Sequence, residues 1–238
     1  MRIRRPALPI AAALLAAALA PALLAGTTES TLFTKPVQLT REHRIELWRE
    51  EAPDIEPGAI AFVGDSITAG FPLLTAFPEL RTVNRGIPGD TSTQVLERMQ
   101  ESVYDLDPST VVLMIGTNDL GHGGTIEQVI ENTARIVRLV QANEPQARIV
   151  LQSVYPVYAG DPDALARSAV GLRTNEALDD VNSALQALAG LAGVEYLDVN
   201  TALRGDDGLR IEYTVDGLHL SPAGYEAAAA VLTGVLGR

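Results

Sequence analysis

The chain has 238 residues, which is long enough for one large domain with a hydrophobic core of its own. Its 30 acidic and 18 basic residues give a net charge of −12, and a phosphate backbone would repel so acidic a surface, which argues against a nucleic-acid partner. The sequence has no cysteine, which excludes disulfides, thiolate chemistry and cysteine-ligated zinc.

The first 25 residues differ in character from the rest of the chain. Three arginines precede an apolar stretch over residues 10–20, and small residues suited to cleavage follow at 22–25. This pattern is typical of a secretory signal peptide and predicts export to the periplasm or the extracellular space. A retained membrane anchor is the alternative, because residues 7–25 are apolar apart from two prolines, and membrane contact is expected only in that case.

The remainder of the chain is predicted to form a linker and one α/β domain. Residues 26–36, GTTESTLFTKP, are polar and predict the linker, and residues 37–238 predict the domain. Short continuous apolar runs are typical of strands covered on both faces, and they lie at 59–63, 82–84, 111–115, 149–151 and 194–197.

Helix-capping signals separate these predicted strands. They are Thr91 with Gln94, Thr125 with Gln128, Thr174, and Ser221 followed by Pro222. The capping spacing at Thr91 and Gln94 comes before the apolar residues Val95, Leu96 and Met99. Alternating strands and helices predict a mostly parallel sheet between helix layers, in which ligands bind beyond the carboxyl ends of the strands.

The first strand ends on Gly64-Asp65-Ser66, which places a hydroxyl at that edge of the sheet. Ser66 is a candidate nucleophile, but a serine hydroxyl needs a base to be activated. Asp65 is expected to accept hydrogen bonds from nearby backbone. The segment is not the G-x-S-x-G turn of α/β-hydrolases, because Thr68 stands where the second glycine belongs.

The ends of the second and third strands carry candidate donors for an oxyanion. Gly89, in NRGIPGDTS, lies directly before the helix capped by Thr91, and its backbone N–H can point outward. Gly86 is a neighbouring glycine with which it could be confused. Asn118, in MIGTNDL, follows the third strand on the same edge as Ser66 and has an amide that can donate.

Three histidines are the candidate bases. His43 lies in a charged amphipathic helix pattern that is typical of solvated surface, and His122 lies in a glycine-rich loop with no carboxylate placed to orient it. His219 follows Asp216 by three residues. That spacing allows the carboxylate to bind Nδ1 and leaves Nε2 free to accept the serine proton.

Together these segments resemble the SGNH hydrolases, also called GDSL-type hydrolases, from residue 60 to the C-terminus. The resemblance implies that the four marker residues are Ser66, Gly89, Asn118 and His219, with Asp216 as the acid of the triad. GDSI replaces the family's frequent GDSL, and the segment PGDTS favours Gly89 over Gly86 as the glycine marker. The resemblance also implies an SGNH hydrolase domain with a flavodoxin-like three-layer α/β/α sandwich, whose five-stranded parallel sheet has the order 2-1-3-4-5.

The predicted activity is ester hydrolysis through a covalent acyl-enzyme, with no metal or organic cofactor. The N–H groups of Ser66 and Gly89 and the amide of Asn118 would bind the oxyanion. The motif segments look most like compact family members similar to platelet-activating-factor acetylhydrolase subunits, which favours short acyl groups on a small-molecule, carbohydrate or lipid ester. Three alternatives stay open: a lipase, lysophospholipase or thioesterase for longer chains, an acyltransferase, and a non-catalytic carbohydrate-binding protein.

Overall fold

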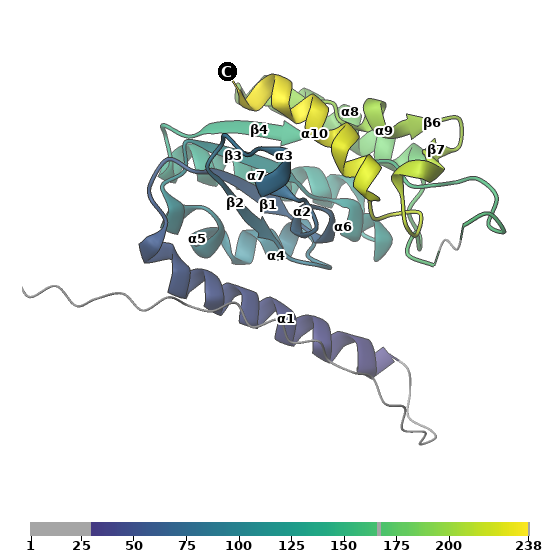
Figure 1. The fold of residues 1–238 in the computed structure, drawn as a ribbon, viewed down its shortest axis with the longest axis horizontal. Coiled ribbons are helices and arrows are strands. Elements are labelled where there is room, and N and C mark those ends of the chain that lie inside the picture. The colour runs from purple at the N-terminus through teal and green to yellow at the C-terminus, as the bar shows by residue number, and fades with distance from the viewer. Residues whose placement is uncertain (1–29, 166–167, 238) are drawn as a thin grey trace, which may run out of the picture.

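The central element of the fold is a five-stranded parallel sheet with the order β2-β1-β3-β4-β5 (Figure 1). The structure is a computed structural model that describes residues 30–165 and 168–237. Each strand lies within two residues of its predicted position, and the predicted order is confirmed. The strands are β1 (Ile60–Gly64), β2 (Thr82–Gly86), β3 (Thr110–Met114), β4 (Arg148–Gln152) and β5 (Glu195–Leu197).

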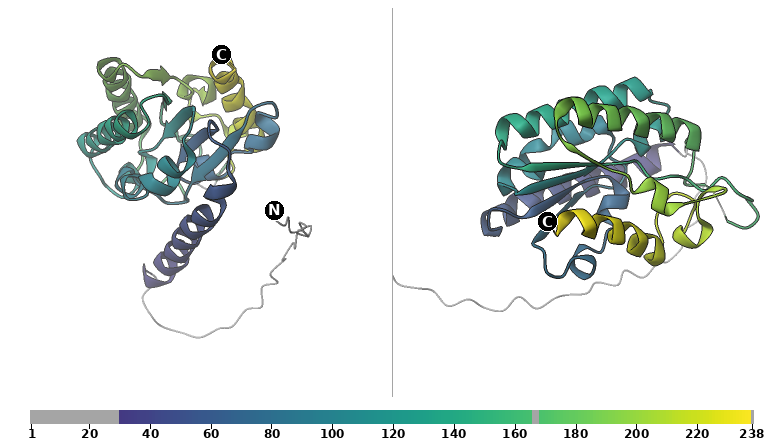
Figure 2. Two further views of the ribbon diagram at one scale, coloured as in Figure 1. Left: turned by 90° about the vertical axis from the view of Figure 1, so that its left-hand side faces the viewer. Right: turned by 90° about the horizontal axis from the view of Figure 1, so that it is seen from above.

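Helices cover both faces of this sheet and complete the predicted three layers (Figure 2). On one face α7 (Ile126–Asn143) packs between α4 (Ser92–Glu97) and α8 (Asn175–Ala192), and α10 (Pro222–Leu236) lies on the other. Shorter elements fill the connections: α2 (Ser66–Ala69), α3 (Leu73–Ala76), α5 (Met99–Ser102), α6 (Thr117–Gly121), α9 (Asn200–Leu203), the 3₁₀ turns η1 (Ala52–Asp54), η2 (Tyr104–Leu106) and η3 (Ile211–Tyr213), and the antiparallel ribbon β6 (Arg204–Gly205) and β7 (Gly208–Leu209).

The predicted capping residues begin the helices. Thr125, Thr174 and Ser221 each accept a backbone N–H from the first turn of their helix. The helix after Thr91 ends at Glu97, and Met99 begins the next helix, α5. It ends there because Arg98 leaves helical geometry and turns its guanidinium inward, to the Asp90 carboxylate and the Gly64 carbonyl.

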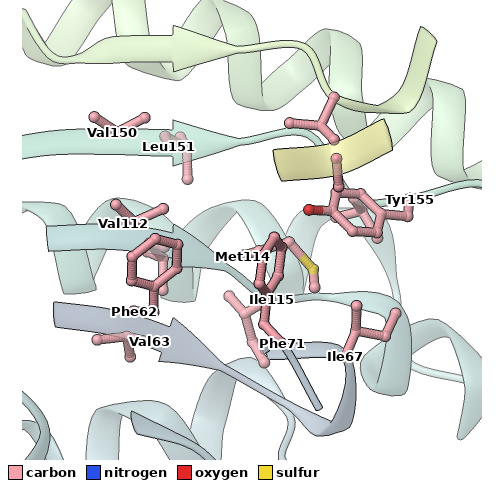
Figure 3. Close-up of a cluster of buried hydrophobic side chains, with 14 of the residues drawn as sticks. Phe62, Val63, Ile67, Phe71, Val112, Met114, Ile115, Val150, Leu151 and Tyr155 are labelled. Atoms are coloured by element: carbon pink, nitrogen blue, oxygen red, sulfur yellow. The ribbon is translucent and has the colours of Figure 1, made fainter. Parts of the chain in front are cut away.

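The hydrophobic core continues to the edge of the sheet at which Ser66 lies. Figure 3 shows side chains from β1, β3 and β4 together with Ile67 of α2 and Phe71. The ring of Phe62 lies 6.0 Å from that of Phe71 and 5.6 Å from that of Phe77, between centroids. Ile67 is fully buried in this cluster, so the packing that stabilises the domain also holds the helix that begins at Ser66.

The N-terminal helix α1 (Ser30–Glu51) is anchored by its second half. Ile45 and Trp48 are buried against Ile87, and the guanidinium of Arg85 lies 4.8 Å from the centre of the Trp48 ring. Arg41 of the same helix reaches Asp90, beside Gly89. The anchored turns tie α1 to the edge of the sheet near the predicted oxyanion loop (Figure 1).

The helix begins earlier than the predicted linker allows. Residues 30–36 of the predicted linker are helical, because a helix held by packing gains one further hydrogen bond for each residue added. Residues 26–29 and the predicted signal peptide over 1–25 lie outside the described residues, so both remain predictions. Across residues 30–165 and 168–237, no helix combines the length and the apolar character needed to span a membrane.

Candidate active site

Ser66 is the first residue of α2 and directly follows the turn that leaves β1. Asp65 caps this helix, because its Oδ1 accepts the backbone N–H of Ile67 at 2.9 Å. Gly64 allows the turn, since a Cβ at that position would overlap the side chain of Thr68. The strand therefore passes into the helix without a loop, and Ser66 lies at the carboxyl edge of the sheet.

The structure brings Ser66 together with His219 and Asp216, which lie about 150 residues later in the chain. The Oγ of Ser66 lies 2.9 Å from Nε2 of His219. The Nδ1 of the same ring lies 2.7 Å from Oδ2 of Asp216. These distances form a continuous hydrogen-bonded chain from hydroxyl to imidazole to carboxylate, which is the arrangement that activates a serine nucleophile.

Asp216 is held as a carboxylate by its surroundings. Its Oδ1 accepts the backbone N–H groups of Leu218 at 3.0 Å and of His219 at 2.8 Å. Partial burial acts to raise the pKa of Asp216, but the hydrogen bonds from the His219 ring and from these two N–H groups outweigh it and lower the pKa below its usual range. An ionised carboxylate at this position orients the imidazole and stabilises its protonated form.

Gly89 offers a free backbone donor in the loop after β2. Its φ of +85° lies in the left-handed region that glycine adopts without strain. It makes no hydrogen bond with any other residue that the structure describes. The next residue, Asp90, is fixed by Arg98 at 2.6 Å and by Arg41 of α1 at 3.2 Å, so the loop that presents Gly89 is held in place.

Asn118 lies in α6, after β3, at the same edge of the sheet. Its Nδ2 donates to the carbonyl of Asp90 at 3.0 Å, and its Oδ1 accepts from Nη2 of Arg173 at 2.7 Å. The second hydrogen on Nδ2 meets no acceptor within the described part of the chain. Asn118 is thus linked to the Gly89 loop and keeps one amide hydrogen available for a ligand.

The family model of the GDSL-like lipase/acylhydrolase family matches residues 62–227, which include all five predicted site residues. Platelet-activating factor acetylhydrolase IB subunit alpha1 from Bos taurus is 32% identical over 192 residues, which cover 78% of each chain. The chain belongs to the GDSL-like lipase/acylhydrolase family. The predicted family resemblance is therefore confirmed, and the protein is an enzyme of the carboxylic ester hydrolase class.

Solved structures agree with this assignment. A Streptococcus pneumonia protein, described as a candidate platelet activating factor, is 32% identical with a TM-score of 0.81, covering 87% of this chain and 97% of its own. A GDSL-like lipase from Bacteroides thetaiotaomicron is 25% identical with a TM-score of 0.70, covering 81% of this chain and 97% of its own. Both solved structures are matched across nearly their whole length.

The two neighbouring glycines of the acylhydrolase differ in what their N–H groups do. The N–H of Gly86 is occupied, because it donates to Oδ1 of Asn84 at 2.9 Å, whereas that of Gly89 is free among the described residues. A Cβ on Gly86 would overlap the backbone of Ala69 in α2. Gly86 therefore allows β2 to approach the helix that carries Ser66, and Gly89 remains the candidate donor.

The other sequence-derived candidates lie away from the reacting groups. His43 is exposed on α1, as predicted. His122 is exposed at the C-cap of α6, and this helix extends to Gly121, so the residue before His122 is helical although the sequence predicted a glycine-rich loop there. Tyr155 and Tyr158, in the segment after β4, are buried and pack in the core. Within residues 30–165 and 168–237, no three His, Asp or Glu side chains gather as a metal site requires.

Two buried charged residues of the acylhydrolase site were missed by the sequence reasoning. Asp119 accepts the N–H of Ser92 at 2.9 Å and its hydroxyl at 2.5 Å, which joins α6 to the start of α4. Arg173 contacts Asn118 directly. Asp119 belongs to the same GTND segment as Asn118 and could have been suspected there, but Arg173 stands in a loop pattern, GLRT, that carries no signal of burial.

Proposed function

We propose that this acylhydrolase cleaves carboxylic esters with short acyl groups through an acyl-enzyme on Ser66. The observation that carries the proposal is the hydrogen-bonded chain from Ser66 Oγ through His219 to Asp216, at 2.9 Å and 2.7 Å. Free donors at Gly89 and Asn118 lie at the same edge of the sheet, where an oxyanion would form.

In the acylation step the Oγ of Ser66 attacks the ester carbonyl carbon while Nε2 of His219 takes the hydroxyl proton. The carbonyl oxygen becomes an oxyanion that accepts hydrogen bonds from the N–H groups of Ser66 and Gly89 and from the amide of Asn118. The tetrahedral intermediate then collapses, and His219 gives its proton to the leaving alcohol. Ser66 is left as an acyl ester.

Deacylation repeats these steps with water in place of the serine hydroxyl. His219 takes a proton from water as the water oxygen attacks the acyl carbonyl, and the same donors bind the second oxyanion. Collapse returns the proton to Ser66 and releases the carboxylic acid. Throughout, Asp216 stays ionised and keeps the imidazole in the tautomer that accepts at Nε2.

Two observations support short acyl groups. The relative from Bos taurus is named as a subunit of an acetylhydrolase. The described residues of the long segment over 155–174 offer little apolar surface for a lid. Tyr155, Val157, Tyr158 and Val170 are buried in the core, Asp161 and Asp163 are exposed, and Leu172 is the one large aliphatic side chain among these residues that is exposed. A deep acyl tunnel needs several apolar side chains that line a cavity, and most of the large apolar side chains described in this segment point into the core instead.

A longer acyl chain is the second candidate, and a groove near the site favours it. This groove has a volume of about 580 Å³ and lies between the end of α2 and the start of α10, with Gly70, Leu220 and Tyr225 among its lining residues. Leu220 follows His219 directly, and Gly70 closes the helix that begins at Ser66. If an acyl chain occupied the groove, each buried methylene would contribute about 0.8 kcal/mol to binding.

Hydrolysis of p-nitrophenyl esters from acetyl to palmitoyl tests the proposal. We expect kcat/KM to be highest for acetyl to butyryl and to fall for decanoyl and longer esters. A purified Ser66→Ala variant supplies the uncatalysed background for each ester. A kcat/KM that is highest at decanoyl or beyond would contradict the short-acyl proposal. The enzyme would then be a lipase or lysophospholipase that uses the same reacting groups.

We also propose that the enzyme acts outside the cytoplasm after removal of residues 1–25. The support is the arginine-rich start followed by an apolar stretch and small residues. The intact mass of the protein recovered from an expressing bacterium tests this. A mature chain beginning near residue 26 is expected, and a full-length chain in the membrane fraction would indicate a retained anchor.

A further inference from the structure

Arg173 is a buried guanidinium in the second half of the long segment over 155–174, and the mechanism above does not use it. We propose that Arg173 is a positioning residue for the oxyanion hole, which fixes the orientation of the Asn118 amide and couples that segment to it. The inference rests on the proposed function, because it assumes that Asn118 donates to the oxyanion.

The guanidinium is surrounded by acceptors from three backbone positions and two side chains. Its Nε donates to the carbonyl and hydroxyl of Thr117, at 2.8 Å and 2.9 Å. Its Nη1 donates to the carbonyls of Ala169 and Val170, at 3.1 Å and 3.0 Å. Its Nη2 donates to Oδ1 of Asn118 at 2.7 Å. A lysine could not satisfy this planar set, because it presents a single ammonium group.

The neighbours of Asn118 permit only one orientation of its amide. A guanidinium can donate but cannot accept, so the atom facing Arg173 must be the amide oxygen. The carbonyl of Asp90 can accept but cannot donate, so the atom facing it must be the amide nitrogen. Rotation of the amide by 180° would set donor against donor and acceptor against acceptor. Arg173 and Asp90 together therefore keep a hydrogen on Nδ2 directed away from both, where a ligand can accept it.

The surrounding backbone is shaped to admit the guanidinium. Gly121 of α6 lies directly against it, and a Cβ at that position would overlap Cζ and both terminal nitrogens of Arg173. Because the group that would have to move is the far end of a flexible side chain, an alanine here would displace the guanidinium more readily than the helix. Gly121 thus provides a second and independent way to disturb the contact with Asn118.

Arg173 links the segment over 155–174, to which it belongs, with Asn118 in α6. The same guanidinium holds two carbonyls of its own segment, at Ala169 and Val170, and the first turn of α6. A change in the segment over 155–174 would therefore be transmitted to Asn118 through one side chain. We expect residues in that segment to alter transition-state stabilisation without contacting the substrate.

A double-mutant cycle on kcat tests whether Arg173 acts through Asn118. Asn118→Ala removes the donor and should lower kcat about 10²–10³-fold, and Arg173→Ala should lower kcat by about tenfold or more with little change in KM. The variant with both substitutions should be within about threefold of Asn118→Ala alone, because the second change has nothing left to disturb. Losses that multiply would overturn the proposal, as would an Arg173→Ala variant that keeps the wild-type kcat.

Gly121→Ala makes the test independent of whether Arg173→Ala folds. We expect Gly121→Ala to lower kcat, as Arg173→Ala does. In a protein that already carries Asn118→Ala, Gly121→Ala should cause no further loss of kcat. Gly190→Ala is the matched control, since Gly190 lies in a helix with open space around its would-be Cβ, and kcat should not change. A normal kcat in a folded Gly121→Ala protein would overturn the proposal.

Labelling by a fluorophosphonate separates this inference from the proposed function. A wild-type protein labelled at Ser66 and active on p-nitrophenyl acetate, with multiplicative losses in the cycle, would overturn the role of Arg173 and leave the proposed mechanism in place. A wild-type protein that is neither labelled at Ser66 nor active would overturn both.

Discussion

Replacement of Asp65 by asparagine should stabilise the protein more at pH 8 than at pH 5. Asp65 is fully buried, and among the described residues its Oδ2 has no hydrogen-bond partner, although Oδ1 accepts the N–H of Ile67. Burial raises the pKa of this carboxyl from 3.8 to about 7, against the lowering effects of the Ile67 N–H and of the charges on Arg173 and His219. The nearby Asp90 carboxylate raises it further.

The sign of the effect follows from which state holds the proton. Between pH 4 and pH 7 the native state keeps Asp65 protonated while the unfolded state has lost its proton, so stability falls as the pH rises through this window. Moving the pKa from 3.8 to about 7 costs the native state about 4 kcal/mol at and above pH 8, and this cost grows by about 3 kcal/mol between pH 5 and pH 8. Asparagine keeps the acceptor for Ile67 and has no charge to bury.

Urea unfolding of the wild type and of Asp65→Asn at the two pH values measures this difference. The gain in unfolding free energy of the variant should be larger at pH 8 than at pH 5 by roughly 2–3 kcal/mol. Asp54→Asn is the control, because it removes an exposed carboxylate with no burial to relieve, and the difference in its effect between the two pH values should be well below that of Asp65→Asn. An Asp65→Asn effect that differs by less than about 0.5 kcal/mol between pH 5 and pH 8 would refute the argument that burial destabilises the carboxylate.

Three further substitutions test the site and its support. Ser66→Ala should fold and lose ester hydrolysis and fluorophosphonate labelling, and activity that survives in a verified preparation would remove Ser66 from the mechanism. Asn118→Asp should be at least as damaging to kcat as Asn118→Ala, because a carboxylate opposes an oxyanion; the proposed donor role fails if either variant stays within about threefold of wild type. Gly86→Ala should lower the melting temperature by several degrees or prevent folding, because its Cβ would overlap the backbone of Ala69, and an unchanged melting temperature would contradict that contact.

The sequence alone determined the layers of the fold and the residues of the candidate site. Continuous apolar runs and capping residues are local signals, and they located the five strands and the starts of the helices at Thr125, Thr174 and Ser221. Parallel strands all end at the same edge of a sheet, so the residues after β1, β2 and β3 had to be neighbours once the order was known. Resemblance to a family supplied that order, since sequence separation does not determine which strands pair.

Other features were decided by the tertiary structure. The sequence favoured Gly89 over Gly86 because Gly89 lies directly before the helix capped by Thr91, and the structure added the state of the two donors: the N–H of Gly86 binds Asn84, whereas that of Gly89 is free among the described residues. The helix after Thr91 stops at Glu97 because the next side chain finds a buried carboxylate, which its apolar stripe could not indicate.

Arg173 and Asp65 show most clearly which properties of the site the sequence could not predict. A charged residue in a loop pattern is expected to be solvated. The guanidinium of Arg173 is buried because Thr117 and Asn118, 56 and 55 positions away in the chain, supply acceptors beside the nearby carbonyls of its own loop. The sequence predicted that Asp65 accepts hydrogen bonds from nearby backbone, but the pKa of Asp65 depends on how completely α2 and its neighbours exclude water from the second carboxylate oxygen. The burial and the hydrogen bonding of a charged group depend on residues that are distant in the chain, so both can be assigned only from the folded structure.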